Sequence, residues 1–142
     1  MTGIAAGLLL AGRIVFSLFF LMSAWNHLVR APQMEGYAKS VGFPFPQLAG
    51  WPSALWLFAS AVSVGAGIWP DVGALMIAAW MVPTALFFHP FWKVEDPMQR
   101  MTQTQLFWRN VTFLGAALAL LAVFAGLGDG VPFSVTGAAL DL

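Results

Sequence analysis

The sequence predicts an all-α integral membrane protein, a four-helix bundle with a short interfacial helix between the first and second transmembrane helices. Composition is the first observation: of 142 residues, 60% are hydrophobic and 8% are charged, whereas soluble domains have about 45–50% apolar and roughly 25% charged residues. The second is that the apolar residues form runs of about 20, the length that crosses a hydrocarbon core of about 30 Å. A soluble fold of this size could not bury so much apolar surface.

Four runs with few charges are expected to span the bilayer. The first is interrupted by Arg13, the second has no charge, and Pro83 is expected to kink the third. The linkers between them are short, so the chain is expected to form a single domain over residues 1–142. The expected spans are about 4–29, 48–69, 72–88 and 106–127.

Two connections are longer than a tight turn. In the first, residues 31–42 have Pro32 near the start and Gly42 just past the end, which is typical of a short helix. Its apolar residues share one face, so we expect it to lie along the membrane surface. The second connection, about 89–104, is expected to be a loop. Between the second and third spans, Asp71 is expected to cap the start of the third helix.

The positive charges predict an orientation. Both long connections, residues 30–47 and 89–105, lie on the same side of a bundle with an even number of spans. They contain four of the six Lys and Arg residues of the chain. The positive-inside rule therefore places these two connections in the cytoplasm and both termini outside. The four residues are Arg30, Lys39, Lys93 and Arg100.

Composition also excludes several kinds of function. The chain has no cysteine, which excludes disulfides, CxxC redox pairs, thiolate-held iron–sulfur clusters and a thiolate nucleophile. The formal net charge is zero, so no nucleic acid partner is expected. No catalytic motif stands out, and we expect no catalytic residue and no catalytic activity of the chain's own.

Arg13 is the most unusual residue of the expected spans, because a cation inside the membrane costs about 2.5 kcal/mol or considerably more. Arg13, Ser17, Phe20, Ala24 and His27 follow helical spacing and share one face. We expect that face to point into the bundle. The alternative is that Arg13 extends its side chain to the outer headgroups.

A second group of polar residues is expected at the ends of three helices. His27 closes the first helix, His89 and Trp92 close the third, and Arg109 with Asn110 opens the fourth. An apolar pocket with a few convergent polar groups would suit a quinone or another small lipophile. Two alternatives stay open: the side chains only bond helix ends and lipid phosphate, or the two histidines hold a metal or a haem. Two histidines without an HxxxH or HxxE pattern are weak evidence for a metal, and none is expected.

Several segments resemble the DoxX family of small bacterial membrane proteins. The region 88–92 (FHPFW), followed by 95–97 (EDP) and 107–110 (FWRN), matches in order and spacing. Gly12-Arg13 with 19–24 (FFLMSA) resembles the family's first helix, and Gly42 with Phe43 and Pro44 its first loop. The resemblance covers about residues 12–121. Many relatives have an acidic residue in the second span, near Leu57 to Ala59, and this chain does not.

The resemblance implies a four-helix protein of the bacterial inner membrane with an association with redox physiology. Relatives include the quinone-linked subunit of a thiosulfate:quinone oxidoreductase and proteins of a membrane complex that responds to oxidative stress. We therefore expect an accessory, non-catalytic subunit of a redox complex, with other membrane or redox subunits as partners and quinone as its possible ligand. The alternatives are a small transporter or channel component and a membrane scaffold or assembly factor. Arg13, His89, Trp92 and Asn110 are the family-like positions.

Overall fold

The structure, a computed structural model, describes residues 1–140 and 142, and in this part it is all helical with no strand. The predicted all-α class is therefore confirmed. The described part has five α-helices, of which α2 is the shortest and lies between the first two long ones in the chain, and short turns connect them. The α-helices are α1 Gly3–Val29, α2 Ala31–Ser40, α3 Trp51–Ala66, α4 Pro70–Pro83 and α5 Pro97–Leu127.

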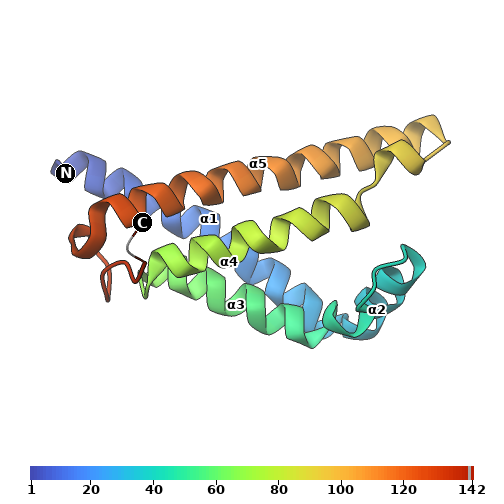
Figure 1. Cartoon of the computed structure of the whole chain (residues 1–142), viewed down its shortest axis with the longest axis horizontal. Coiled ribbons are helices and arrows are strands. Elements are labelled where there is room, and N and C mark those ends of the chain that lie inside the picture. Colours follow the sequence, from blue (N-terminus) through green and yellow to red (C-terminus); the bar gives the residue numbers. More distant parts are fainter. Residues whose placement is uncertain (141) are drawn as a thin grey trace.

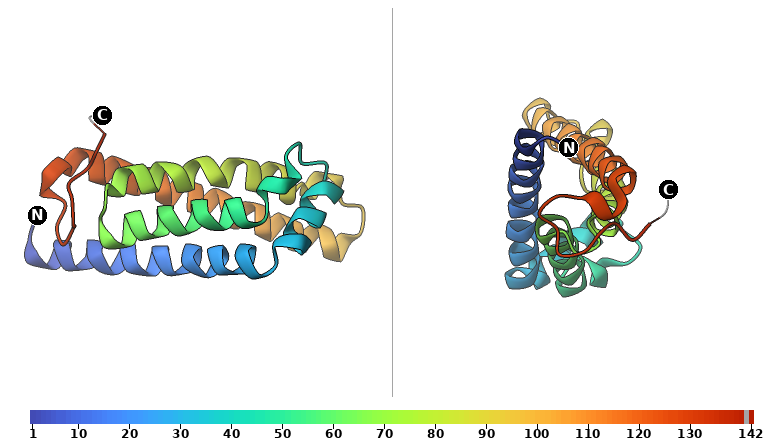
Figure 2. Two further views of the ribbon diagram at one scale, coloured as in Figure 1. Left: turned by 90° about the horizontal axis from the view of Figure 1, so that it is seen from below. Right: turned by 90° about the vertical axis from the view of Figure 1, so that its left-hand side faces the viewer.

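The helices α1, α3, α4 and α5 run along the long axis of the molecule (Figure 1). The backbone of α1 packs closely against α3, α3 against α4, and α4 against α5. The short helix α2 lies at one end of the molecule, whereas the N-terminus and the C-terminal segment lie at the other (Figures 1 and 2). At the end near α2, the C-terminal part of α1 and the N-terminal part of α5 diverge (Figure 1).

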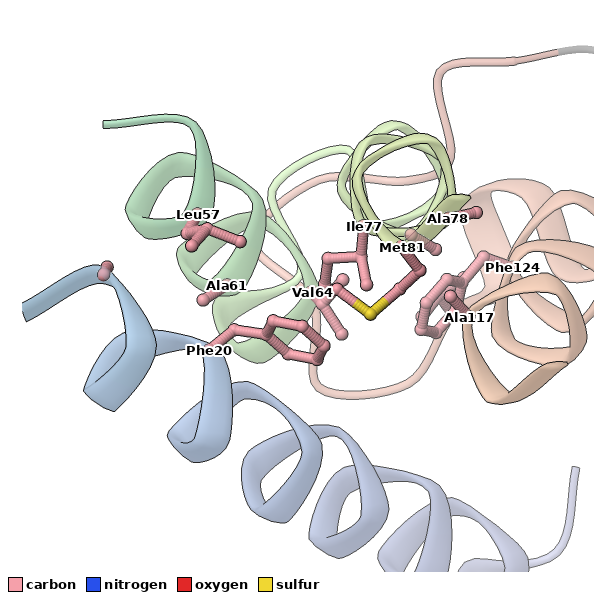
Figure 3. Close-up of a cluster of buried hydrophobic side chains, with 12 residues drawn as sticks. Phe20, Leu57, Ala61, Val64, Ile77, Ala78, Met81, Ala117 and Phe124 are labelled. Carbon is pink, nitrogen blue, oxygen red and sulfur yellow. The ribbon is translucent and has the colours of Figure 1, made fainter. Parts of the chain in front are cut away.

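All four long-axis helices contribute to one apolar core. Figure 3 shows Phe20 of α1, Val64 of α3, Met81 of α4 and Phe124 of α5 pointing toward one another. Small residues let the backbones approach, as is usual for helices packed in a membrane. A Cβ on Gly65 of α3, for example, would lie 3.1 Å from the Ser17 hydroxyl oxygen of α1.

Three helical segments among the described residues are long and apolar enough to cross a membrane: Gly3–Val29, Pro70–Lys93 and Pro97–Gly130. The second predicted span is shorter than expected, because α3 has 16 residues. At 1.5 Å per residue, such a helix is about 24 Å long and falls short of a hydrocarbon core of about 30 Å. The ends of α3 therefore need partners for their backbone polar groups.

The expected loop at 89–105 is wrong in its second half, because α5 begins at Pro97. The Asp96 carboxylate accepts a hydrogen bond from the backbone N–H of Gln99 at 2.8 Å, and Pro97 occupies the first turn. Asp followed by Pro is a strong start signal for a helix. The hydropathy pattern missed it because the first turns of α5 are polar.

Arg13 is fully buried and points into the molecule, as its helical stripe predicts. A guanidinium group has five N–H donors, and each of the five has an oxygen acceptor here, at 2.8 to 3.4 Å. Two acceptors are the backbone carbonyls of Val64 and Gly65 in the last turn of α3. The other three belong to residues 132–134, and the Arg13 guanidinium carbon also lies 5.9 Å from the ring centroid of Phe124. Arg13 thus joins α1, α3, α5 and the C-terminal segment.

Residues 131–140, which we call the C-terminal strap, complete the end of α3. The last carbonyls of a helix lack partners within the helix, and in lipid each unpaired group is costly. The strap amides of Val135 and Thr136 donate to the carbonyls of Ala66 and Gly67, at 3.3 and 2.9 Å. Arg13 binds the two preceding carbonyls, so the last carbonyls of α3 all have hydrogen-bond donors.

Asp71 does not cap α4, which corrects the expectation from the sequence. Trp69 occupies the cap position, Pro70 begins the helix, and Asp71 is fully buried in the first turn. Its carboxylate accepts hydrogen bonds from the strap amides of Ala139 at 2.9 Å and Leu140 at 2.5 Å. A buried carboxylate needs donors, and here they come from a segment 68 residues away in the chain.

We expect Gly67→Ala to destabilise the protein. Gly67 has a φ of +72°, and an added Cβ would lie 2.5 Å from Nη2 of Arg13 and against the Ser134 hydroxyl. The expected loss is about 2 kcal/mol of unfolding free energy, measured as a lower thermal midpoint in detergent. Gly115→Ala is the control, since no atom lies within 4 Å of its added Cβ. Equal midpoints for the two variants would contradict this role of Gly67.

Arg13→Lys is expected to release the C-terminal strap. A lysine has three donors on one nitrogen, so it cannot serve both α3 and the strap, and breaking a buried charged network of this kind costs about 3 kcal/mol. Carboxypeptidase should therefore trim the variant faster than the unmodified protein. Arg30→Lys, at an exposed position after α1, controls for the substitution itself. Equal trimming rates in all three proteins would show that Arg13 does not hold the strap.

Candidate functional site

A cavity of about 260 Å³ lies at the end of the molecule near α2. Its volume is close to the lower end of the roughly 300–1,000 Å³ that ligand pockets have. The wall is formed by α1, α2, α4 and α5 together with the turns beside them, and most of it is apolar or aromatic. The lining residues are Phe19, Phe20, Ser23, His27, Met34, Tyr37, Phe43, Ala49, Trp80, Met81, Pro83, Thr84, Phe88, His89, Arg109 and Asn110.

Both histidines of the chain line this cavity. Nδ1 of His27 lies 2.5 Å from the backbone carbonyl oxygen of Ala49, and Nδ1 of His89 lies 2.9 Å from the side-chain oxygen of Gln103. Because a carbonyl oxygen only accepts, Nδ1 of His27 carries the hydrogen. The His27 ring also stands nearly perpendicular to the Trp80 ring, with centroids 5.9 Å apart. The orientation of His27 is therefore fixed from two sides.

Asn110 is the polar residue of the cavity that the fold leaves unsatisfied. Its side chain is 3% exposed, and its Nδ2 has no hydrogen-bond partner. Most buried polar groups are paired, so an exception needs an explanation. The other unpaired group among the described residues is the hydroxyl of Ser17, which lies where α1 meets α3 and not in the cavity.

Arg109, the neighbour of Asn110, places the guanidinium carbon 5.7 Å from the ring centroid of Phe19 on α1. This is cation–π distance. Arg109 is otherwise exposed, so the cavity has a cation at its rim and an amide donor in its wall. Its lining includes no Asp or Glu.

The irregular end of α4 shapes one wall. Pro83 has no N–H to donate, and beyond it the chain continues as a π-helical turn, Thr84–Phe88. The Thr84 hydroxyl donates to the Trp80 carbonyl at 2.8 Å. Such turns are frequent at functional sites. The predicted kink at Pro83 thus takes the form of a wider turn, and Pro83, Thr84 and Phe88 all face the cavity.

The helix α2 and the loop after it cover the cavity from the side. The Tyr37 hydroxyl donates to the Phe88 carbonyl at 2.9 Å, and the Phe43 ring centroid lies 5.4 Å from that of Phe88. Gly42, with a φ of +75°, turns the chain so that Phe43 can reach this contact. Partial burial raises the pKa of Tyr37 above its usual value, which keeps its hydroxyl a donor.

Four of the six residues predicted for a ligand site lie together in this cavity: His27, His89, Arg109 and Asn110. Arg13 lies elsewhere, bound to the carbonyls of α3 and the strap. Trp92 lies in the turn Phe91–Lys93 and packs against the rings of Phe91 and Phe107, with centroids 5.2 and 5.7 Å away. Neither lines the cavity.

Tyr37, Trp80 and Gln103 are among the cavity-associated residues that the sequence analysis did not propose for the site. Two signals could have found them. Pro83 inside an apolar run predicts an irregular wall, and the apolar face of residues 31–42 needs a partner that α4 and its π-helical turn provide. Gln103 was hidden because its segment was expected to be a loop.

The family model described as DoxX matches residues 8–90, which is more than half of the 142 residues. The chain belongs to the DoxX family. The matched range runs from Leu8, within α1, to Pro90. It includes His27 and His89 of this DoxX protein, whereas Trp92, Arg109 and Asn110 lie beyond its end. No curated protein and no solved structure matches the chain.

The ionisation of Tyr37 gives a direct check on the cover of the cavity. Tyr37 is the only tyrosine of the chain, so tyrosinate absorbance reports on it alone. Burial raises its pKa, so the hydrogen bond to Phe88 persists below the unfolded pKa of about 10 and is lost as the pH rises through the higher folded value. We expect the absorbance midpoint in mild detergent to exceed that of the SDS-unfolded protein. Identical midpoints would contradict the partial burial of the Tyr37 hydroxyl.

Proposed function

We propose that this DoxX protein is a non-catalytic subunit of a membrane redox complex that binds a lipid-soluble ligand with a small polar ring, of the quinone class, in the cavity between α1, α2, α4 and α5. The observation that carries the proposal is the Asn110 amide: a buried donor without a partner in the wall of an aromatic cavity. A quinone carbonyl would accept this hydrogen bond, and the aromatic lining suits its ring.

The aromatic seam between α1 and α5 supports a lipophilic ligand. At the cavity end α1 and α5 diverge (Figure 1), and the seam between them is filled by rings such as Phe19 and Phe113, whose centroids lie 4.5 Å apart. Phe19 is itself part of the lining. A ligand with its ring in the cavity would have its apolar tail directed into the lipid between these helices.

The membrane placement is part of the proposal. The three long segments and the shorter α3 together cross the inner membrane four times. At the two ends of α3, the strap and the turn before α3 fill the part of the bilayer that this short helix does not reach. The helix α2 lies at the surface on the cytoplasmic side, with the residues around 30–47 and 89–96, and both termini lie outside. Positive charge at the cavity end supports this orientation. The partners are other membrane or redox subunits, and the ligand site would face the cytoplasmic half of the bilayer.

Asn110→Leu tests the site. The variant removes the donor and keeps a similar volume, so the affinity for a decyl-tailed benzoquinone should fall roughly tenfold, measured by calorimetry in lipid nanodiscs. Removing an unpaired buried amide should leave the thermal midpoint of the ligand-free protein unchanged or higher. A structural asparagine would instead lower it.

Asn26→Leu is the matched control, since Asn26 and Asn110 are the only asparagines of the chain and Asn26 does not line the cavity. It should leave the quinone affinity unchanged. The proposal fails if the unmodified protein binds no quinone, or if Asn110→Leu and Asn26→Leu bind it equally well.

A further inference from the structure

His27 and Asn110 line the same cavity, and they offer different hydrogen-bonding groups: a neutral imidazole has an acceptor nitrogen, whereas the Asn110 amide has a donor without a partner. Nδ1 of His27 donates to the Ala49 carbonyl at 2.5 Å, so Nε2 of the neutral ring carries a lone pair. Ala49 cannot retreat easily, because it is 2% exposed and its own N–H is bonded to the Pro46 carbonyl. The carbonyl contact thus decides which ring nitrogen can accept.

The surroundings favour this neutral ring. The cavity lining has one cation, Arg109, and no carboxylate that would stabilise an imidazolium. The remaining titratable groups of the lining are Tyr37, which donates to Phe88, and His89. His89 repeats the arrangement of His27, since its Nδ1 meets the side-chain oxygen of Gln103 at 2.9 Å. The lining therefore has acceptors on two imidazoles, and donors on the Asn110 amide and the Arg109 guanidinium.

A ligand that satisfies this wall must both give and receive a hydrogen. We infer that the cavity selects a head group with hydroxyl donors, a hydroquinone in preference to the corresponding quinone, and that His27 is the residue that determines this selectivity. The inference rests on the proposed function and deepens it. A hydroquinone oxygen accepts from Asn110 while its O–H groups donate to imidazole nitrogen.

A quinone of the same size fits the cavity less well. Its carbonyls accept from Asn110 but give nothing to Nε2 of His27, which is then cut off from water without a partner. An acceptor left unpaired in this way weakens binding by roughly tenfold to a hundredfold. The preference arises from hydrogen bonding alone, since the two ligands share ring and tail.

The test compares three probes on the unmodified protein in nanodiscs without oxygen: decyl-tailed benzoquinone, its hydroquinone, and the dimethyl ether of that hydroquinone. Their common tail makes partition into lipid similar. We expect the hydroquinone to bind at least tenfold more tightly than either of the others. This comparison needs no variant, so it does not depend on the folding of one.

His27→Asn tests the acceptor nitrogen alone. The asparagine amide nitrogen takes the place of Nδ1, and no atom takes the place of Nε2. Its hydroquinone affinity should fall to that of the quinone, and its quinone affinity should stay within about twofold of the unmodified protein. Asn110→Leu should instead weaken both ligands together. An unchanged elution profile and thermal midpoint establish that the variants are folded.

The outcomes separate the two proposals. If the unmodified protein binds quinone and hydroquinone equally, or if His27→Asn keeps the preference, the selectivity is refuted while the ligand site stands. If the unmodified protein binds none of the three probes, the proposed function falls, and the selectivity falls with it.

Discussion

The end of α3 sets the main constraint on this fold. The helix has 16 residues, which makes it shorter than a hydrocarbon core is thick, and the last carbonyls of a helix have no donors within the helix. Arg13 serves two of them and strap amides serve two more. A cation suits this position because the C-terminal end of a helix carries partial negative charge. The packing of α1 on α3 and the path of the strap both follow from this requirement.

The long-axis helices differ in length, and the space that the shorter ones leave is filled differently at the two ends of the molecule. Where α3 ends and α4 begins, the strap fills the space and is held by Arg13 and Asp71, from α1 and α4. At the other end, α1 and α5 diverge (Figure 1), and α2 with its following loop covers only part of the space. The cavity is what remains there, and the π-helical turn after Pro83 widens it.

Much of this arrangement could be predicted from the sequence, because lipid makes apolar run length and helical spacing informative. The buried stripe of Arg13, Ser17, Phe20 and Ala24 on α1 is confirmed. The convergence of both histidines with Asn110 followed from helix ends at similar depth. The strap could not be predicted, because residues 131–140 have no periodic pattern and their partners are fixed by tertiary contacts. For the same reason Asp71 looked like a cap, since local sequence does not reveal a partner 68 residues away.

Arg13 and Asn110 are buried polar residues that the protein satisfies to different extents. All five donors of the Arg13 guanidinium are paired with protein oxygens, although a charged group with five donors is the hardest kind to satisfy in lipid. Asn110, a smaller and neutral group, keeps a buried donor free. The other unpaired buried side-chain group of the described residues, the Ser17 hydroxyl, lies where α1 meets α3, so of the two only Asn110 lines the cavity. The unpaired amide belongs to the lining of the cavity that also includes His27, and this supports the proposed ligand site.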